Sequence, residues 1–307
     1  MIDDFRNLRI LVTGASGYIG SALVTKLVGL GCSVAVIKRA ASDLTCLNHV
    51  REKIVIYECN TSTKSVIAVV KDSNPDVVVH LASLFIAEHE SGDIENLIAS
   101  NLLFSTQIAE AMKHNNVKFL INTGTSWEHF NNSKYNPVCL YAATKHAFES
   151  ILEYYVQTSS LRVITLKLFD TYGPRDTRPK LIPFLQRLAL NGEAMAMSSG
   201  EQLIDIVHIE DVVEAFLLAI KRLRTLEAHS VESYGVSSLA PVTLKSLVRM
   251  YEEASGMKLN IDWGLREYRE REVMIPWNSG CNVPGWRPKI GLSEGFRGLG
   301  ESVLTTV

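Results

Sequence analysis

Residues 9–20 read RILVTGASGYIG, and this segment is the strongest indication of the fold in the sequence. Its first five residues have the apolar character of a buried strand, whereas the apolar spacing of residues 21–28 is helical. Between strand and helix, Gly14 permits a tight turn, Gly17 lets the backbone approach a phosphate, and Gly20 lets the helix pack closely. Because the free N–H groups at a helix N-terminus attract anions, the stretch predicts a site for a dinucleotide pyrophosphate. The glycine spacing alone also fits an ordinary strand-to-helix turn.

Apolar runs alternate with helical patterns through the first half of the chain. Continuous apolar runs separated by helices indicate parallel strands that are buried on both faces and joined by right-handed crossovers. We therefore predict an α/β fold, a doubly wound parallel sheet of the Rossmann type, whose ligands bind beyond the carboxyl ends of the strands. The runs cover residues 9–13, 33–38, 54–58, 77–81, 118–122 and 162–168.

The pattern changes after residue 172, where shorter apolar segments mix with helical ones. We expect a Rossmann domain at residues 1–170, with further elements from residues 203–237, and a smaller C-terminal substrate-binding lobe at residues 171–307. Because no long polar linker separates them, the two parts are expected to share one interface. The predicted helices lie at 140–155, 181–190, 209–223 and 243–254, and the predicted short strands at 194–197 and 204–208.

The composition narrows the class of partner. The 307 residues include 31 Lys and Arg against 33 Asp and Glu, a formal net charge of −2. No cationic run stands out, so we expect neither a nucleic acid polymer nor a membrane as a partner. Neither a signal-peptide pattern nor an apolar stretch of about 18 residues occurs, which predicts a cytoplasmic protein. The five cysteines lack C-x-x-C pairing, so neither a disulfide framework nor a metal site is expected.

A tyrosine and a lysine stand four positions apart in YAATK, residues 141–145. Asn136 and Pro137 form a turn before a helical pattern, so Tyr141 and Lys145 lie on one helix face. The nearby ammonium is expected to lower the pKa of Tyr141 from about 10 toward neutrality, where a phenol exchanges a proton with a carbonyl or an alcohol. An isolated pair of this kind also fits the surface of an amphipathic helix. Together with the glycine turn, the pair indicates a redox enzyme.

Further short motifs follow in order along nearly the whole chain. With them, the chain resembles the extended short-chain dehydrogenase/reductase family, also called the NAD(P)-dependent epimerase/dehydratase family, whose members act on nucleotide sugars. The resemblance implies a nucleotide-diphosphate sugar as substrate and a homodimer formed through residues 94–114 and 140–157, although the apolar positions there also fit a buried core. The motifs are VHLAS at 79–83, NLL opening a helix at 101–103, YGPR at 172–175, DIVHIEDV at 205–212 and GWRP at 285–288.

The resemblance implies a cofactor site spread over several strand ends. The glycine turn holds the pyrophosphate, residues after the third predicted strand approach the adenine, and residues after the fourth line the cofactor. Lys145 also bonds to the nicotinamide ribose, and the residues near position 172 flank the nicotinamide. The implied cofactor-binding residues are Gly14, Ser16, Gly17, Tyr18, Ile19, Asn60, Thr61, Leu81, Ala82, Ser83, Thr123, Tyr141, Lys145, Leu168 and Tyr172.

The resemblance also implies a catalytic trio of Thr125, Tyr141 and Lys145, in which Thr125 donates a hydrogen bond to the reacting oxygen. Thr123 and Ser126 are alternatives for this hydroxyl, since a threonine at a strand end commonly bonds to the backbone instead. A lone histidine in the segment at 205–212, which the family uses near the nucleotide, also fits a packed core. The implied substrate-binding residues are Ser126, Asp170, Arg175 and Lys180.

The second predicted strand ends in VIKR, residues 36–39, and this ending bears on the choice of cofactor. NAD enzymes of this fold place Asp or Glu there to bond the ribose 2′-hydroxyl, whereas a guanidinium grips a 2′-phosphate. We therefore predict NADPH (NADP+), with Arg39 as the main contact and Lys38 as a secondary one. A solvated basic turn is the alternative.

The residues after Thr125 bear on the reaction. Relatives that dehydrate nucleotide sugars carry Asp-Glu directly after this threonine, whereas Ser126 and Trp127 follow here. The chain is most similar to nucleotide-sugar 4-ketoreductases such as the CDP-abequose and CDP-paratose synthases. This similarity implies NADPH-dependent reduction of a CDP-4-keto-3,6-dideoxyhexose, a step toward cell-surface polysaccharide. An NAD-dependent 4-epimerase and a non-catalytic dinucleotide sensor are the alternatives.

Two departures from the family concern the substrate site. Ile204 stands before Asp205, where relatives carry an arginine, and Asp170 stands where many carry asparagine. A charged run at residues 266–272 either supplies the missing cation or forms the solvated face of a helix, and we favour the helix face.

Overall fold

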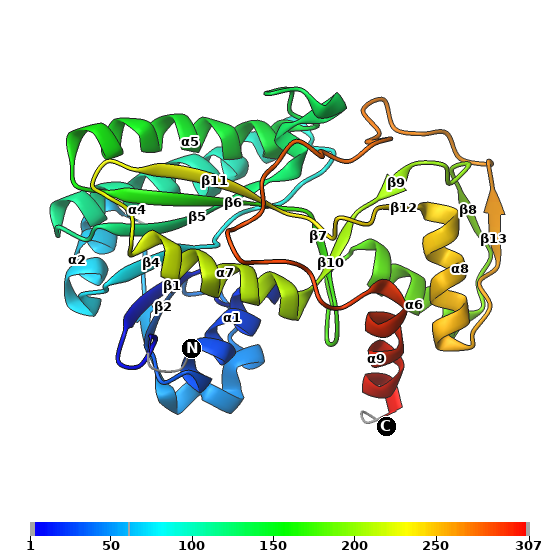
Figure 1. Ribbon diagram of the computed structural model, residues 1–307, viewed down its shortest axis with the longest axis horizontal. Helices are drawn as coiled ribbons and strands as arrows, with labels where there is room; N and C mark the ends of the chain where they lie inside the picture. The colour runs from blue at the N-terminus through cyan, green and yellow to red at the C-terminus, as the bar shows by residue number, and fades with distance from the viewer. Residues whose placement is uncertain (1–3, 61, 305–307) are drawn as a thin grey trace.

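The computed structural model describes residues 4–60 and 62–304, which form a large sheet with helices on both faces and a smaller lobe beside it (Figure 1). The sheet has seven parallel strands in the order β11-β6-β5-β4-β1-β2-β3. The strand order reverses between β1 and β4, the place where doubly wound sheets bind ligands. The strands are β1 (Arg9–Thr13), β2 (Ser33–Lys38), β3 (Ile54–Glu58), β4 (Val77–His80), β5 (Phe119–Thr125), β6 (Arg162–Leu168) and β11 (Val231–Val236).

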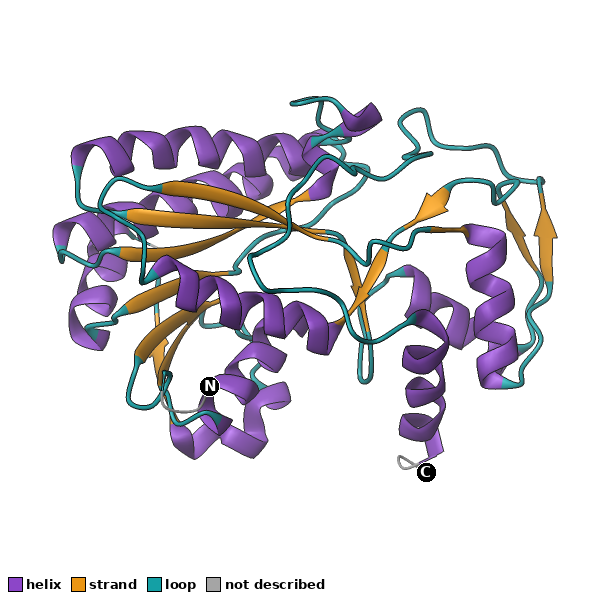
Figure 2. Ribbon diagram, viewed as in Figure 1, coloured by secondary structure: helices purple, strands orange, loops and turns teal. Residues whose placement is uncertain are grey.

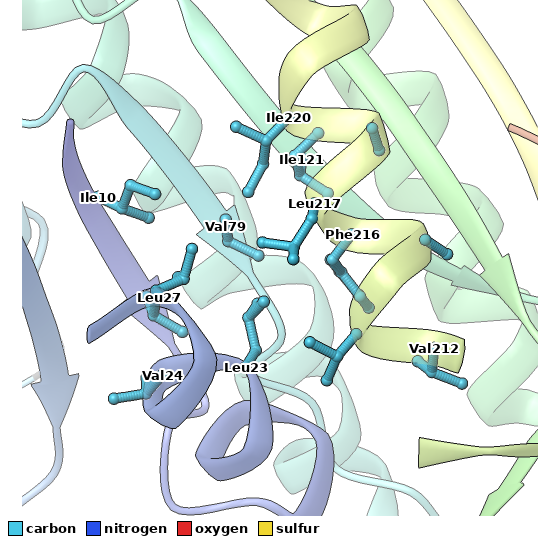
Figure 3. Packing of buried hydrophobic residues seen from close by; sticks show 14 of the residues in the cluster. Ile10, Leu23, Val24, Leu27, Val79, Ile121, Val212, Phe216, Leu217 and Ile220 are labelled. Carbon is cyan, nitrogen blue, oxygen red and sulfur yellow. The ribbon is translucent and has the colours of Figure 1, made fainter. Parts of the chain in front are cut away.

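Helices cover the two apolar faces of the sheet, as parallel strands require. Figure 2 shows this arrangement, with the orange strands between layers of purple helices. In Figure 3, Leu23 and Leu27 of the first helix face Leu217 of the covering helix around Val79 of β4, and all four residues are buried in one cluster. The helices are α1 (Tyr18–Gly29) and α7 (Ile209–Leu223) on this face, and α2 (Thr63–Ser73), α4 (Phe104–His114) and α5 (Leu140–Thr158) on the other.

The predicted doubly wound sheet is confirmed, with two differences. β5 continues to Thr125, three residues beyond the predicted end at residue 122, so the hydroxyl residues belong to the strand itself. β11 was not located from the sequence. Its sequence, VESYGV, is only partly apolar, and it pairs with β6 at the edge of the sheet, where strands need less apolar surface than in the centre.

The smaller lobe has its own apolar core, to which α6, α8 and α9 contribute. Its strands pair two at a time, β10 with β7, β12 with β9 and β13 with β8. The lobe elements are β7 (Asp170–Tyr172), α6 (Leu181–Asn191), β8 (Met195–Met197), β9 (Leu203–Ile204), β10 (Ile206–His208), β12 (Val242–Thr243), α8 (Leu244–Ser255), β13 (Ile261–Trp263) and α9 (Leu292–Leu304).

Buried side chains from two sequence motifs join the two parts. Asp211 of α7 accepts hydrogen bonds from the backbone N–H groups of Lys289 and Ile290, at 3.0 and 2.9 Å. The Trp286 indole donates to the Asp211 carbonyl oxygen at 2.9 Å. Asp205 accepts a 2.6 Å bond from the loop that follows β11. Asp211 therefore holds the C-terminal segment against α7, and Asp205 holds the loop after β11 beside β10.

Shorter helical segments complete the described chain. One of them, η3, is π-helical and lies between α3 and α4 without a break, so NLL is inside a helix and not at its start as predicted. Within the described ranges, no helix is long and apolar enough to cross a bilayer. The short segments are η1 (Thr45–Lys53), η2 (Ser91–Asp93), α3 (Ile94–Ile98), η3 (Ala99–Leu103), η4 (Ser126–Glu128) and η5 (Phe130–Asn132).

Candidate active site

A cavity of about 370 Å³ lies at the carboxyl ends of β1, β4, β5 and β6. Segments far apart in sequence meet there because each follows a parallel strand, and all such strands end at the same edge. Phe85, Trp127 and Arg178, which were not predicted as site residues, also line the cavity. The predicted residues that line it are Gly14, Gly17, Tyr18, Ile19, Leu81, Ser83, Thr123, Thr125, Ser126, Tyr141, Lys145, Leu168, Asp170 and Lys180.

The glycine turn has no room for side chains. Gly14 has a φ of 70°, and a Cβ there would lie 2.6 Å from the backbone N of Ala82. A Cβ on Gly20 would overlap the Gly14 carbonyl oxygen. Gly17 is the N-cap of α1 and offers no side chain to the N–H groups of the first turn, which stay open to an anion. With Ser16 exposed on the same turn, these features fit a dinucleotide pyrophosphate.

The two basic residues at the end of β2 have different surroundings. Lys38 Nζ forms a 3.0 Å ion pair with Glu58 of β3, which offsets its charge. Arg39 is exposed one residue beyond the strand. Asn60 is also exposed, and its side-chain oxygen accepts a 3.0 Å bond from the backbone two residues on. Thr61, the other predicted adenine contact, lies outside the described residues.

A buried histidine beneath the cavity was not predicted to have a role. His80 Nδ1 lies 2.8 Å from Thr13 Oγ1, and its Nε2 lies 2.8 Å from Ser105 Oγ. The Thr13 oxygen accepts a 3.1 Å bond from Ala82 N–H, so its own proton faces Nδ1. Burial, and then the charge of Lys145, lower the pKa of His80 to about 3. The neutral ring therefore donates from Nε2 to Ser105 and ties the ends of β1 and β4 together.

Tyr141 and Lys145 lie one turn apart on α5, and both line the cavity. Burial lowers the pKa of Lys145 to about 8, although the negative charges of Glu128 and Glu149 oppose this. Burial also raises the pKa of Tyr141 above its ordinary value, and the charge of Glu128 adds to the rise. The prediction of a lowered Tyr141 pKa is therefore wrong, because burial has the largest effect on this phenol and the negative charge of Glu128 adds to it. A phenol that stays protonated at neutral pH is a proton donor.

Three hydroxyl groups at the end of β5 were candidates for bonding to the reacting oxygen. Thr123 donates to the His80 carbonyl oxygen at 2.9 Å, so its proton is used within the sheet. Thr125 Oγ1 accepts a 3.3 Å bond from Trp127 N–H, which leaves its own proton to be donated elsewhere. Ser126 is buried at the start of η4 and lines the cavity as well. Thr125 fits the predicted role best.

Asn101 organises the loop beside the phenol, a role that its sequence motif did not reveal. It is buried in the π-helical turn, and its side chain bonds to both the N–H and the carbonyl of Leu84, at 2.8 and 3.0 Å. It also bonds to Ser83 at 3.2 Å and to Thr144, between the tyrosine and the lysine on α5, at 3.0 Å. Ser83 in turn hydrogen-bonds to Tyr141. The π-turn thus fixes the loop relative to α5, a common use of such turns.

The substrate side of the cavity joins an ion pair to an aromatic wall. Lys180 Nζ lies 2.9 Å from Asp170 Oδ1 and 3.7 Å from the centre of the Phe85 ring. That ring contacts Trp127 and Tyr141, with centroid distances of 5.6 and 5.0 Å. The two predicted polar contacts therefore pair with each other next to apolar rings.

Arg175 does not lie where it was predicted. It is exposed in a left-handed turn with a φ of 60°. Arg178 lines the cavity instead, held by a 2.8 Å ion pair with Asp176 and by stacking 4.5 Å from the centre of the Tyr18 ring. The conformation of the turn after β7 determines which arginine side chain reaches the cavity. The YGPR motif alone does not predict that conformation.

Tyr172 also differs from its predicted role in cofactor binding. Its ring is buried in the lobe core, edge-on to His208 and Phe296 at 5.4 Å from each. Its partner His208 caps α7 by accepting a 3.4 Å bond from the backbone of that helix, and burial lowers its pKa. Both residues are therefore structural, because β7 and β10 pair within the lobe.

The charged run at residues 266–272 is not helical, so the favoured prediction of a solvated helix face is wrong. Arg269 lies with Ile204 in cavities between the two parts of the molecule. It is 5.8 Å from the centre of a Trp127 ring and 2.9 Å from Glu272. A cation therefore stands beside the position where the family arginine is missing.

Comparison with known proteins agrees with this geometry. The chain is 25% identical over 297 residues to CDP-abequose synthase of Salmonella muenchen, covering 95% of this chain and 96% of that protein. It is 28% identical over 273 residues to CDP-abequose synthase of Yersinia pseudotuberculosis, covering 88% and 92%. It is 24% identical over 330 residues to UDP-glucose 4-epimerase of Drosophila melanogaster, covering 93% of each.

Two solved structures show the same fold. UDP-glucose-4-epimerase from Stenotrophomonas maltophila, with bound NAD and formylated UDP-arabinopyranose, aligns with a TM-score of 0.85 at 19% identity, covering 97% of this chain and 98% of that one. UDP-N-acetylglucosamine 4-epimerase from Methanobrevibacter ruminantium M1, in complex with UDP-N-acetylmuramic acid, aligns with a TM-score of 0.85 at 21% identity, covering 98% and 100%. Residues 10–232 match the NAD dependent epimerase/dehydratase family, and the chain belongs to that family of enzymes.

Proposed function

We propose that this chain is an NADPH-dependent 4-ketoreductase that acts on a nucleotide-activated deoxysugar, with a CDP-4-keto-3,6-dideoxyhexose as its substrate. The observation that carries the proposal is that Thr125, Tyr141 and Lys145 share one cavity with the glycine turn. The similarity to CDP-abequose synthases along nearly the whole chain supports the class of sugar.

Each catalytic side chain has a separate task in this reaction. Tyr141 donates its proton to the C4 carbonyl oxygen, and Thr125 orients that oxygen with a hydrogen bond. Lys145 places a positive charge beside the phenol as the proton leaves. A bound nicotinamide cofactor supplies the hydride. The raised pKa of Tyr141 supports reduction, because reduction needs the phenol in its protonated form.

The surroundings of Thr125 support reduction over dehydration. Elimination of water needs an acid and a base beside the sugar. Ser126 and Trp127 line the cavity where dehydratases carry that pair. Glu128, the next acid along the chain, is wholly buried and its carboxylate lies 2.5 Å from Lys167 Nζ. It is therefore occupied by a structural partner.

The aromatic wall supports a deoxygenated sugar. Phe85 packs against both Trp127 and Tyr141, and the three rings give the cavity an apolar surface beside the catalytic phenol. A hydroxyl placed against such a wall loses its hydrogen bonds to water without replacement. A sugar that lacks hydroxyls where it meets the wall avoids that cost.

The exposed Arg39 supports NADPH as the cofactor, whereas Lys38 is already paired with Glu58. Arg39→Ala should weaken NADPH binding by about tenfold or more and leave NADH binding unchanged, because a charge-assisted bond to a 2′-phosphate contributes about 1.5–3 kcal/mol. Lys38→Ala is the matched control and should have the smaller effect. An unchanged preference for NADPH after Arg39→Ala would contradict this assignment.

Isotope transfer tests the reaction itself. With NADPH that carries deuterium at C4 of the nicotinamide, each turnover should place one deuterium at C4 of the sugar and consume one cofactor. Mass spectrometry of the product and absorbance at the nicotinamide band measure both. A sugar product formed without label and without net loss of NADPH would refute the reductase.

The similarity to UDP-glucose 4-epimerases favours NAD-dependent 4-epimerisation as the second candidate. An epimerase returns its hydride to the sugar and keeps its cofactor. Tightly held NAD that co-purifies and is recovered oxidised after many turnovers would favour this candidate.

We also infer a homodimer formed through the helices around η3. Apolar side chains on these helices are exposed, with Ile94 at 42%, Ile98 at 39%, Leu103 at 54% and Tyr154 of α5 at 58%. Contiguous exposed apolar residues commonly mark an interface. Light scattering should give twice the chain mass for the wild type, and Leu103→Glu should shift the mass toward one chain. A monomeric wild type at micromolar concentration would rule the dimer out.

A further inference from the structure

A buried group of charged residues lies directly behind the catalytic end of β5. It brings together Glu128 from η4, Lys167 from β6, and His146 and Glu149 from α5. Lys167 Nζ lies 2.5 Å from one Glu128 oxygen and 3.1 and 3.2 Å from the two Glu149 oxygens. His146 Nδ1 lies 3.3 Å from the same Glu128 oxygen. Glu128 is 0% exposed and Lys167 is 5% exposed, so these charges are held away from water.

The group is an ion-pair cluster and not a metal site. The acceptor atoms of Glu128, His146 and Glu149 lie within 4.8 Å of one another, close enough to share a cation. The ammonium of Lys167 already occupies that position, within hydrogen-bond distance of both carboxylates. One ammonium cannot balance two buried carboxylates. Burial, and then the charge of Glu128, accordingly raise the pKa of Glu149 to about 7.

The cluster is built against the backbone that carries Thr125. The second oxygen of Glu128 accepts a 2.9 Å hydrogen bond from Thr125 N–H. Gly124, one residue earlier, pairs with Lys167 in the sheet. A Cβ on Gly124 would lie 2.9 Å from a Glu128 oxygen and 3.0 Å from a Glu149 oxygen. Glycine at this position therefore lets both carboxylates reach the strand end.

The same carboxylate acts on the two proton-bearing groups of the cavity. Among the charged groups, Glu128 contributes most to keeping the pKa of Lys145 from falling further. It is also the charged group that contributes most to the raised pKa of Tyr141. Although burial favours its neutral form, hydrogen bonds from His146 and Lys167 hold the pKa of Glu128 below its ordinary value. Its negative charge is therefore permanent at neutral pH.

We propose that Glu128 is a positioning residue whose carboxylate, held by Lys167, fixes the backbone of Thr125 and places a buried negative charge behind the strand end that lines the cavity. The two carboxylate oxygens of Glu128 have separate partners. One accepts a hydrogen bond from Thr125 N–H at the strand end, and the other accepts one from the Lys167 ammonium. The charged and titratable groups that face it are Lys167 from β6 and Lys145, His146 and Glu149 from α5. The expected effect of Glu128 on turnover rests on the proposed ketoreductase activity, whereas its expected effect on the pKa of Lys145 does not.

The variant Glu128→Gln tests this role, because the amide keeps an acceptor for Thr125 N–H and removes the charge. The pKa of Lys145, followed by NMR of ¹⁵N-labelled lysine side chains, should fall from about 8 by about one unit. Lys145→Arg identifies the signal. Glu232→Gln is the matched control, since Glu232 pairs with Arg222 near the opposite end of the sheet and should leave the Lys145 signal in place.

The activity readout is the pH profile. In Glu128→Gln the alkaline limb of kcat/KM should move to lower pH by the same amount as the NMR titration. An NMR pKa that stays within about 0.2 units of the wild type would overturn the proposal, and a reduced melting temperature alone would then show a merely structural residue. If Glu128→Gln fails to fold, the charge-balanced double variant Glu128→Gln with Lys167→Met takes its place and should show a smaller fall in the same direction, because the loss of the neighbouring Lys167 charge partly offsets the loss of the Glu128 charge. The NMR result stands even if the wild type reduces no keto-sugar.

Discussion

The Rossmann half and the lobe half of this molecule use their sequence motifs differently. In the Rossmann half, the glycine turn, the end of β5 and the Tyr141–Lys145 pair all reach one cavity. In the lobe half, Tyr172 and Asp205 are buried in structural contacts. The difference follows from topology, because parallel strands deliver their carboxyl ends to one edge, whereas the lobe strands pair only two at a time.

The difference shows for which residues a role can be inferred from a family motif. Residues that directly follow a central parallel strand keep their place in the site, since the sheet fixes that place. Residues of the lobe depend on turns and on contacts between distant segments, so their roles must be taken from the structure. Substitutions in the first group should affect chemistry, and those in the second should affect packing.

The largest effect is expected from Gly14→Ala, with Gly192→Ala as its counterpart in the lobe. Both glycines have a left-handed backbone, with φ of 70° and 67°, so both variants carry a strain of about 1–2 kcal/mol. Only Gly14 also lacks room, since its Cβ would overlap the backbone of the loop that follows β4. No atom of the described residues lies within 4 Å of a Cβ on Gly192. Gly14→Ala should therefore cost more than about 3 kcal/mol of stability and abolish cofactor binding. Equal losses of unfolding free energy in the two variants, measured by urea unfolding, would contradict this expected difference.

A pH effect of about tenfold per unit should follow from Lys145. In the proposed reaction the protonated form of Lys145 is the active one, and its pKa of about 8 means that this form is lost as pH rises through 8. The kcat/KM should accordingly fall above pH 8. Lys145→Arg, which stays charged, should remove this limb even though its maximal rate is lower. A profile that is flat between pH 7 and 9 in the wild type would contradict the burial of a working ammonium.

A smaller effect is expected at the ion pair on the substrate side. Lys180→Ala should raise the KM for the nucleotide sugar by about tenfold with little change in kcat, because it removes one charged contact worth about 1.5 kcal/mol. Arg175→Ala is the control, since Arg175 is exposed outside the cavity lining. If Arg175→Ala raises the KM more than Lys180→Ala does, the placement of the YGPR turn is wrong.

The smallest effect is expected from Tyr172→Phe. The Tyr172 hydroxyl is buried without a hydrogen-bond partner among the described residues, so its removal breaks no bond. Stability should stay the same or rise by up to about 1 kcal/mol, and kcat/KM should stay within about twofold. A tenfold weaker affinity for the cofactor, measured by calorimetry, would restore the role that the family resemblance implies.

Much of the sheet could be predicted because buried parallel strands are apolar along their whole length, as in β1, β2 and β6. The glycine turn and the Tyr141–Lys145 spacing were equally local features. The lowered pKa of Lys145, the π-turn at Asn101 and the pairing of Glu128 with Lys167 could not be predicted. Each depends on burial or on contact between segments that are far apart in the chain. The apolar periodicity of the sequence predicts helices and strands but not such contacts.

The most direct test of the proposed chemistry is a single-turnover comparison of the wild type with Tyr141→Phe, using NADPH and a CDP-4-keto-3,6-dideoxyhexose. Removing the proton donor should slow oxidation of NADPH by about a thousandfold and leave NADPH affinity unchanged. A variant that still oxidises NADPH at a rate within about threefold of the wild type would show that Tyr141 is not the acid of the reaction.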